Sequence, residues 1–410
     1  MGIKILVLQS YNIFIENSAL SNRWRTIVEG LSGKDCLIHI FFTSGYRSKS
    51  EKEQYGRRGF IDDKIEYTYL SKQNRYSYLG GRINLYLLSW WYNRINSVHL
   101  RRITKKLKPD IVFLNTSLDA MHTFSLAFRS YARNFKLMIE VNEFNDIWDI
   151  HMTNWLQKWR NKKSNDLLLK VILPRLSICL VMTDTLMEHY KGMPGINPDA
   201  EFLKIPMTVD LSRFENTQAN DTYKKPYIAY CGSGGFYANG VDILIKSFAR
   251  ISHLFPEIRL YIAAFHGNDE SKMLGLIKEN KLSEKAIYLG VLNRNEIPSF
   301  LAGAELLALP RPDSRQARGG FPTKLGEYLA SGSPVCVTRV GEIPQYLADN
   351  ESAFMADPGD EVSFAKAMER CLRDPVNAKR VADNGKQVAH ITFNMEYQTD
   401  RLFSFLEQRV

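Results

Sequence analysis

The chain has 410 residues, 45% of them hydrophobic, so it is long enough for two globular domains of ordinary composition. Its formal net charge of +10 favours anionic partners such as phosphate groups, nucleic acid or anionic lipid. The five scattered cysteines show no CxxC or metal spacing, which is typical of reduced cytosolic thiols and argues against a disulfide framework. The first residues form too short an apolar core for a signal peptide, and no run of about 18 apolar residues predicts a membrane-spanning helix.

The first half of the chain alternates short apolar runs with helical segments. Such runs are typical of buried parallel strands, so the alternation predicts a doubly wound α/β domain over residues 1–205. The expected strands cover residues 4–8, 37–43, 111–115, 137–141 and 178–182, and a helix is expected at 19–31. Residues 44–75 are polar and poorly periodic, which predicts a long excursion from the sheet.

The same alternation restarts after a polar linker at residues 215–226. The expected strands cover 227–231, 259–264, 286–289, 306–309 and 335–338, and the expected helices cover 241–255, 296–302 and 391–409. This pattern predicts a second domain over residues 206–392. The fold class is therefore α/β, with two Rossmann-like doubly wound domains.

Residues 311–334 are the most informative stretch, because a strand end, a glycine-bearing loop and a short helix follow one another there. Pro322 suits the first helical position, and Gly332 before a proline is typical of a helix end. The first turn of such a helix offers unpaired amides and partial positive charge, and Gly319 and Gly320 let a ligand approach the backbone. Nearby cationic side chains are those of Arg311, Arg315, Arg318 and Lys324. Together these features predict a site for a phosphate or diphosphate.

Glu327 lies three residues beyond Lys324, so both side chains can share one face of the helix. At ~1.5 Å per residue it lies roughly 7 Å along the axis from Pro322, about the span from a diphosphate to a ribose. A carboxylate there could accept hydrogen bonds from two ribose hydroxyls; the alternative is a solvated glutamate. The flexible turn at 232–235 also follows a strand, and two loops at the carboxyl ends of strands favour a nucleotide site.

Three stretches of the second half resemble the GT-B glycosyltransferases of family 4: GSGGFYANGVDILIKSFA, IPMTVDLSRF and GGFPTKLGEYLASGSPVCVT. The resemblance covers most of residues 200–395. It implies a GT-B fold, in which two Rossmann-like domains face a cleft and a C-terminal helix at about 393–410 packs back onto the N-terminal domain. It also implies retaining, metal-independent transfer of a sugar from a nucleotide-sugar donor. The FPTK form resembles members that make bacterial surface polysaccharides.

The resemblance carries over to individual residues. It implies that Glu327 binds the donor ribose, that Lys324 binds the phosphate, and that the loop around Leu292 holds the base. The expected donor-binding residues are Gly232, Ser233, Arg311, Gly319, Gly320, Phe321, Pro322, Thr323, Glu327 and Leu292, and the expected catalytic residues are Lys324, Arg318 and Glu143.

The sequence departs from the family pattern at two places. The first of two family glutamates maps to Gly319, so the backbone amides of Gly320 and Phe321 would hold the sugar; a weakened donor site is the alternative. Residues 238–239, just before Gly240, lack the basic residue that the family tends to carry there. The candidates to replace that phosphate contact are Lys324, Arg318 and Arg311.

Acidic residues after an N-terminal strand are the candidates for handling the acceptor. Glu143 and Asp146 could orient or deprotonate an acceptor hydroxyl, and the alternative is that they cap the following helix. Glu16 and Asn17, in the first strand–helix loop, could contact the donor phosphates or the acceptor. The sequence has no convincing DxD motif and no histidines at metal spacing, so we expect no metal and no cofactor besides a donor such as a UDP- or GDP-sugar.

Two segments combine cationic and aromatic residues. Residues 80–108 contain seven Lys or Arg and no acid, and Trp155 and Trp159 recur at four-residue spacing within the basic segment 155–163. Such segments suit an anionic membrane surface. The alternative is a core-facing helix with a solvated basic side. Nucleic acid is a third possibility, which we set aside because no nucleic-acid-binding motif occurs.

We therefore expect a cytoplasmic glycosyltransferase, peripheral on the inner face of the membrane, that acts on a lipid-linked glycan in bacterial surface polysaccharide synthesis. Two alternatives stay open. One is a GT-B-like sugar-nucleotide epimerase or hydrolase, which would turn over donor with no acceptor present. The other is a non-catalytic partner subunit that binds nucleotide-sugar without turnover.

Overall fold

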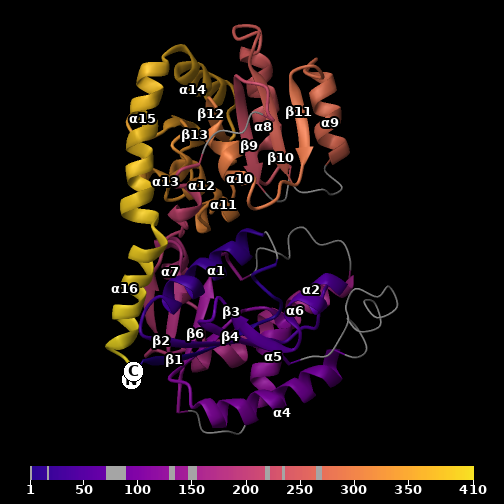
Figure 1. Cartoon of the computed structure of the whole chain (residues 1–410), viewed down its shortest axis with the longest axis vertical. Coiled ribbons are helices and arrows are strands. Elements are labelled where there is room, and N and C mark those ends of the chain that lie inside the picture. Colours follow the sequence, from indigo (N-terminus) through magenta and orange to yellow (C-terminus); the bar gives the residue numbers. More distant parts are fainter. Residues whose placement is uncertain are drawn as a thin grey trace. The chain divides into compact units, whose positions relative to one another are not determined.

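The computed structural model describes residues 2–15, 18–70, 89–128, 134–145, 155–217, 222–232, 236–264 and 270–410 (Figure 1). The chain forms two compact units, each built on its own sheet. Unit 1 comprises Met1–Glu16, Trp24–Ile205 and Thr399–Val410, and unit 2 comprises Asn17–Arg23 and Pro206–Gln398. The α/β class with two Rossmann-like sheets, which the sequence predicts, is confirmed.

Unit 1 contains an eight-stranded sheet in the order β3-β4-β2-β1-β5-β6-β7-β8. Its strands are β1 (Ile3–Gln9), β2 (Cys36–Phe42), β3 (Arg58–Ile61), β4 (Ile65–Tyr69), β5 (Ile111–Leu114), β6 (Lys136–Val141), β7 (Ile178–Val181) and β8 (Glu201–Lys204). Its helices are α1 (Ala19–Ser32), α2 (Lys49–Tyr55), α4 (Ser89–Leu107), α5 (Leu118–Ala127), α6 (Trp155–Leu167), the π-helix η3 (Leu168–Ile172), the 3-10 turn η4 (Leu173–Arg175), α7 (Asp184–Lys191) and most of α16 (Met395–Glu407). All strand pairs of this sheet are parallel except the pair of β3 with β4.

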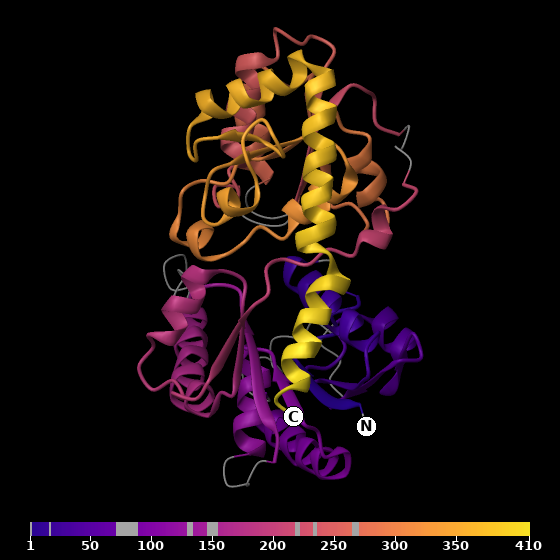
Figure 2. The ribbon, with the colours of Figure 1, turned by 90° about the vertical axis from the view of Figure 1, so that its left-hand side faces the viewer.

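Side chains of β1 alternate between the two faces of this sheet, as the period of a strand requires. Leu6 and Leu8 pack in a cluster with α5, while Ile5 and Val7 pack in a second cluster with α1. Leu402 and Leu406 of α16 join the second cluster. Both views show the two ends of the chain next to each other at the edge of unit 1 (Figures 1 and 2).

The expectation of a long excursion at 44–75 is wrong for the part of it that the structure describes. Residues 44–70 contain α2 and the antiparallel pair β3–β4, and Asp62 and Asp63 at the hairpin turn have left-handed φ angles of 49° and 56°. Helix α2 begins with a capping pattern, because the Ser48 side chain accepts from the Glu51 amide at 2.9 Å. The Ser-x-x-Glu spacing is the sequence signal that could have revealed this helix.

Unit 2 contains a six-stranded parallel sheet in the order β11-β10-β9-β12-β13-β14. Its strands are β9 (Tyr227–Gly232), β10 (Arg259–Ala264), β11 (Ala286–Gly290), β12 (Leu306–Leu309), β13 (Val335–Thr338) and β14 (Phe354–Ala356). Its helices are the 3-10 turn η5 (Leu211–Phe214), α8 (Val241–Ile251), α9 (Glu270–Glu279), α10 (Ile297–Ala302), α11 (Arg315–Gly319), α12 (Lys324–Ser331), α13 (Ile343–Tyr346), α14 (Glu361–Arg373), α15 (Pro375–Val388) and the π-helix η6 (Ala389–Phe393).

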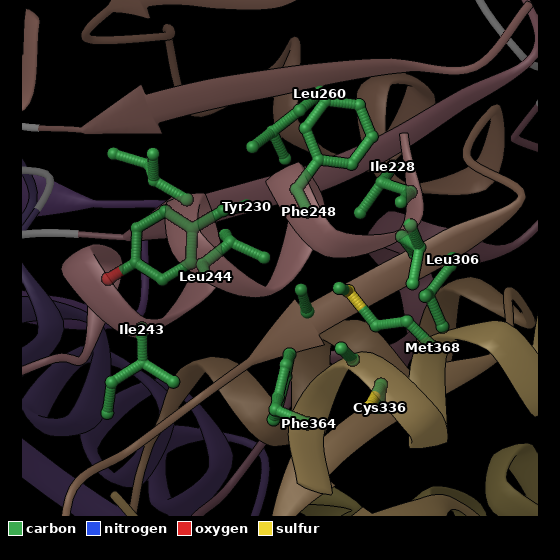
Figure 3. Packing of buried hydrophobic residues seen from close by; sticks show 14 of the residues in the cluster. Ile228, Tyr230, Ile243, Leu244, Phe248, Leu260, Leu306, Cys336, Phe364 and Met368 are labelled. Carbon is green, nitrogen blue, oxygen red and sulfur yellow. The ribbon is translucent and has the colours of Figure 1, made fainter. Parts of the chain in front are cut away.

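One face of this sheet carries a core formed with α8 and α14. Phe248 of α8 and Phe364 of α14 are fully buried there beside Leu260 and Leu306 (Figure 3). Tyr230 lies at the edge of this cluster, and its hydroxyl oxygen points away from the other labelled side chains (Figure 3). The core therefore holds the ring of Tyr230 while its polar end is available to a neighbouring group.

Candidate functional site

The candidate site lies in unit 2, at the carboxyl edge of the parallel sheet. Strand β9 ends at Gly232, and the segment after β12 runs through α11 into α12. Gly240, just before α8, has a left-handed φ of 71°, and a Cβ atom there would overlap the carbonyl oxygen of Pro310. Only glycine therefore allows the start of α8 to lie so close to the end of β12.

The start of α12 differs from the sequence-based prediction. The helix begins at Lys324, so the placement of Pro322 at its first position is wrong by two residues. The amide of Leu325 donates to the Pro322 carbonyl at 3.0 Å, and the amide of Gly326 donates to Met207 Sδ at 3.2 Å. The expectation that the first turn leaves its amides unpaired is therefore wrong for these two groups. Fewer amides of this helix terminus are therefore available to an anion than the sequence predicts.

Lys324 is half-buried and has fixed neighbours. Its Nζ donates to Tyr230 Oη at 2.8 Å, and a longer contact of 3.4 Å joins it to Asn239 Oδ1. Nζ also lies 4.5 Å from the centroid of the Tyr230 ring. Burial, together with the nearby charge of Arg311, lowers the pKa of Lys324 to about 7. An anion placed here would favour the charged form of the amine, because it would supply the counter-charge that burial removes.

Lys324 lies close to the position before Gly240, where the sequence lacks the basic residue of the family pattern. Asn239 precedes that glycine, and Lys324 Nζ reaches its side chain. A Cβ atom at Gly232 would overlap Lys324 Nζ, so the absence of a side chain there leaves room for the amine. The end of β9 and the residue before Gly240 thus meet Lys324, which lies about ninety residues further along the chain.

Tyr328 couples α12 to the end of β9. Its hydroxyl accepts from the Cys231 amide at 2.7 Å and donates to the Cys231 carbonyl at 3.0 Å. Burial raises the pKa of the Tyr328 phenol well above its ordinary value, so it stays a neutral donor and acceptor. This pair of bonds holds the end of β9 at a fixed place along α12.

Glu327 is paired with Arg213, a residue that sequence reasoning missed. Arg213 Nη1 donates to Glu327 Oε1 at 2.6 Å, and Nη2 donates to the carbonyl of Arg294 at 2.9 Å. The Arg213 and Glu327 side chains are only 14% and 19% exposed. Arg213 therefore connects the expected ribose-binding carboxylate with the loop expected to hold the base. It lies in the 3-10 turn η5, 114 residues before its partner, and although the stretch IPMTVDLSRF around it resembles the family, no local pattern shows that the two residues pair.

The expected glycine-bearing loop contains the short helix α11, so that prediction is also corrected. Ser314 caps this helix by accepting from the Ala317 amide at 3.1 Å. Arg318 is 64% exposed and makes two hydrogen bonds of 2.6 Å to the Asp313 carboxylate. Gly319 is buried within the same helix. Arg318 therefore differs from Lys324, because its charge is already matched by a neighbouring acid.

Three of the other expected donor-binding residues, Phe321, Pro322 and Thr323, directly precede α12. Phe321 is buried and its ring lies 5.3 Å from that of Tyr346 and 5.6 Å from that of Phe393. This packing fixes the backbone of the segment just before the helix. The half-buried members of the expected set are Gly232, Leu292, Arg311, Gly320, Thr323 and Glu327, and the buried members are Gly319, Phe321 and Pro322.

The remaining expectations concern unit 1 or lie outside the described residues. Glu143 is half-buried just after β6, and its carbonyl accepts from Tyr190 Oη at 3.0 Å. Its proposed role toward an acceptor stays a prediction. The expectations for Ser233, Asp146, Glu16 and Asn17 fall on residues that the structure does not describe.

Two properties of the described residues bear on metals and membranes. In the described ranges, no group of three or more His, Cys, Asp or Glu side chains could hold a metal ion. Metal-independent chemistry stays an expectation. Among the helices whose residues are described, none has the length and apolar character needed to cross a bilayer.

This geometry suits a ligand with an anionic and a hydroxyl-bearing part. Lys324 offers a cation that an anion would stabilise, and Glu327 lies one turn further along α12 as a hydrogen-bond acceptor. Their spacing of three residues puts the two groups on neighbouring positions of one helix face. A nucleoside diphosphate has both parts in that order.

The second half of the chain matches the family model of glycosyl transferases group 1, over residues 212–388. Among curated proteins, the chain is similar to MMP alpha-(1->4)-mannosyltransferase of Mycolicibacterium hassiacum, at 25% identity over 166 residues, which cover 38% of each chain. The chain spans about two fifths of the length of the curated relatives it matches first.

Solved structures resemble the chain over its whole length. Sucrose-phosphate synthase of Thermosynechococcus elongatus has a TM-score of 0.75 at 15% identity and covers 99% of this chain and 98% of its own. HepE of Anabaena, in complex with UDP and glucose, has a TM-score of 0.70 at 13% identity and covers 99% of this chain and all of its own. The expected GT-B fold is thereby confirmed.

Proposed function

Residues 212–388 belong to the family of group 1 glycosyl transferases, and from this premise we propose that the protein transfers a sugar from a nucleotide-sugar donor. The proposal adds that configuration at the anomeric carbon is retained. The observation that carries it is the pair of side chains on α12: Lys324 with a pKa lowered to about 7, and Glu327 oriented by Arg213. Together they match a diphosphate and a ribose.

In the proposed reaction, the bond between the anomeric carbon and the diphosphate oxygen breaks. The electron pair stays on the leaving phosphate, so negative charge grows there in the transition state. Lys324 stabilises that charge, and the acceptor hydroxyl oxygen forms the new bond to carbon while its proton goes to the leaving phosphate. A fixed cation in a site of low polarity stabilises developing charge more than it would in water.

The roles of the other residues are proposed by the same reasoning. Arg311 raises the positive potential near the phosphate, and Arg318 would add to it only by leaving Asp313. The backbone of Gly320 and Phe321 would hold the sugar, because Gly319 offers no carboxylate. Glu143 is the proposed group for orienting the acceptor hydroxyl.

The proposed donor is a UDP- or GDP-sugar, and UDP-sugars are the first to test. HepE, whose fold this chain shares, was solved with UDP and glucose. The proposed acceptor is a lipid-linked glycan of a bacterial surface polysaccharide, reached from the cytoplasmic side of an anionic membrane. The FPTK motif supports the acceptor class, and the basic aromatic segment at 155–163 supports the membrane surface.

A second candidate function is a partner subunit that binds nucleotide-sugar without turnover. It is favoured by Gly319, which stands where the family carries a glutamate, so one donor contact lacks a carboxylate. Release of nucleoside diphosphate in the presence of acceptor separates the two. Turnover supports the transferase, and tight binding with no turnover across many acceptors supports the subunit. Turnover without any acceptor would instead indicate an epimerase or hydrolase.

The first test is a thermal-shift screen of nucleoside diphosphates and their sugars on the wild type and on Glu327→Ala. Ligand at 100 times Kd should add about 2.7 kcal/mol to the wild type, which is a visible shift. We expect one diphosphate to stabilise the wild type and much less the variant. The control is Glu279→Ala, an exposed glutamate of α9 whose loss should leave the shift unchanged. No shift with any diphosphate would overturn the proposal.

A further inference from the structure

A pocket of about 450 Å³ lies in unit 1 among α5, α6, η3 and η4. It shares no residue with the candidate site of unit 2. Its lining combines cations with aliphatic side chains and one acid. The residues that matter here are His122, Lys163, Asp166, Leu167, Lys170 and Arg175.

The pocket has an excess of positive charge. Its one lining acid, Asp166, is paired with Lys170 at 2.8 Å, and this bond lowers the pKa of the carboxyl group. Lys163 and Arg175 add two further cations to the lining. A ligand that enters this pocket therefore meets a net positive charge, which suits an anionic group such as a phosphate ester.

His122 adds a neutral donor to these cations. The Thr123 hydroxyl donates to Asn93 Oδ1, so the amide nitrogen of Asn93 faces His122 Nδ1 at 3.2 Å. His122 Nδ1 then accepts, and Nε2 carries the proton. Burial, with the nearby charge of Lys163, lowers the pKa of His122, which keeps the ring neutral. A phosphate oxygen could accept from this Nε2–H group.

Helix α6 leads from the pocket to the surface. All of its residues are described, and none of their side chains is buried. Trp155, Trp159, Lys163 and Leu167 follow one another at four-residue spacing, so they form one stripe on the helix. The two tryptophans are 71% and 54% exposed, and Lys163 Nζ lies 5.2 Å from the centroid of the Trp159 ring. Exposed indole rings beside lysines are typical of segments that lie in a membrane interface.

A second exposed surface of this kind lies two helices away. Helix α5 lies between α4 and α6 (Figure 1). Helix α4 contains no acid, and Trp91, Ile95 and Val98 are exposed on it. Large exposed apolar side chains that gather among cations are unusual on a surface that faces only water. They support a partner with both negative charge and an apolar interior.

We propose that this pocket binds the phosphate of an anionic phospholipid and that α6 docks unit 1 on an anionic bilayer. Lys163 and Arg175 contact the phosphate, the aliphatic lining receives the glycerol and upper acyl carbons, and Trp155 and Trp159 enter the interface. The inference deepens the membrane partner suggested under the proposed function. It requires no turnover, so its failure and the failure of the sugar-transfer proposal are separately observable.

The experiment is co-sedimentation of the full chain with vesicles of phosphatidylglycerol and phosphatidylcholine, compared with pure phosphatidylcholine. We expect binding to the mixed vesicles only. Lys163→Gln should weaken the apparent Kd about fivefold, since one basic residue near such a surface contributes about that factor. Trp159→Ala should weaken it by about tenfold, because it removes a large interfacial ring.

Two matched control variants distinguish a specific phosphate site in the pocket from general attraction of the protein to the vesicle surface. Lys278→Gln removes an exposed lysine of α9, and Phe60→Ala removes an exposed ring of β3. Both should leave the Kd unchanged within twofold. Equal binding to both kinds of vesicle, or equal losses in Lys163→Gln and Lys278→Gln, would overturn the proposal. The far-ultraviolet circular dichroism of each variant verifies that it is folded.

Two further experiments test whether the anion that the pocket binds is a soluble phosphate ester or a nucleic acid, rather than a lipid. Glycerol phosphate should give no thermal shift in millimolar amounts, whereas a shift that Lys163→Gln abolishes would assign the pocket to a soluble phosphate ester instead. A single-stranded oligonucleotide at physiological salt should not displace the protein from vesicles. Displacement that depends on Lys163 would indicate a nucleic-acid site and overturn the lipid proposal.

Discussion

The two units place their positive charge in different ways. In unit 2, Lys324 and Arg213 are half-buried, and each is fixed by hydrogen bonds to groups of other elements. In unit 1, the cations of α6 lie on a helix that buries no side chain. A half-buried, fixed cation can recognise one small anion at one place. An exposed and adaptable set suits an extended surface, and its contribution falls as salt rises.

This difference in burial affects how specifically each cation recognises an anion. Lys324 has given up much of its hydration, which is why its pKa is lowered, and only a well-placed counter-charge can compensate. The exposed lysines of α6, Lys158 and Lys162, keep most of their hydration and gain little from any single contact, whereas Lys163 is half-buried at the pocket. Removing a single cation should therefore weaken ligand recognition more in unit 2 than in unit 1.

The largest effect is expected from Lys324→Met, which keeps most of the length of the side chain but removes the charge. We expect kcat/KM for the donor to fall by about 10²–10³, the loss typical when a group that stabilises transition-state charge is removed. The measurement is the initial rate of nucleoside diphosphate release with the best acceptor found. Lys278→Met, at an exposed position of α9, is the control. A rate within threefold of wild type would remove Lys324 from the mechanism.

An intermediate effect is expected from Arg213→Ala. Glu327 would lose its orienting partner and the Arg294 loop its anchor, so UDP should bind about tenfold more weakly, the size of one charge-assisted hydrogen bond. Calorimetry should show that pyrophosphate, which lacks the ribose and base, binds equally well to both proteins. Arg213→Lys should recover part of the loss. A parallel loss of pyrophosphate binding would mean that Arg213 acts only through the fold of unit 2.

The smallest effect is expected from pH. The pKa of Lys324 is lowered to about 7, so the free protein loses this proton as pH rises through 7. A diphosphate that prefers the charged amine must restore the proton, so its affinity should fall by about threefold between pH 6.5 and 7.5. Lys324→Met should remove this component and leave the opposite contribution from the titrating phosphate. Identical pH profiles for the two proteins would contradict the assignment of Lys324 as the phosphate-binding cation.

Much of the fold could be predicted because it depends on local pattern. Short apolar runs must be buried on both faces of a sheet, and this requirement located β1, β5, β9 and β12. The end of α12 was marked by Gly332, which has a left-handed φ of 77°. The region 44–70 was missed, because a polar edge hairpin and a short helix lack the apolar run on which the strand prediction rests.

The site was only partly predictable from sequence. Lys324 and Glu327 could be singled out because they are neighbours on one short helix with a recognisable stop signal. Arg213 could not, because nothing in the residues around it shows that it pairs with Glu327. The same applies to Met207, whose sulfur accepts a hydrogen bond from the Gly326 amide, a group that the sequence predicts to be unpaired.

The sequence by itself determined the alternation of strands and helices, the two α/β units, and the helix that carries Lys324 and Glu327. These follow from side-chain periodicity and from backbone preferences that act over a few residues. Only the tertiary structure decided which amides of α12 are hydrogen-bonded, that Arg213 orients Glu327, and that burial lowers the pKa of Lys324. Those properties depend on groups far apart in the chain, because hydrogen bonding and desolvation are set by the neighbours that packing brings together.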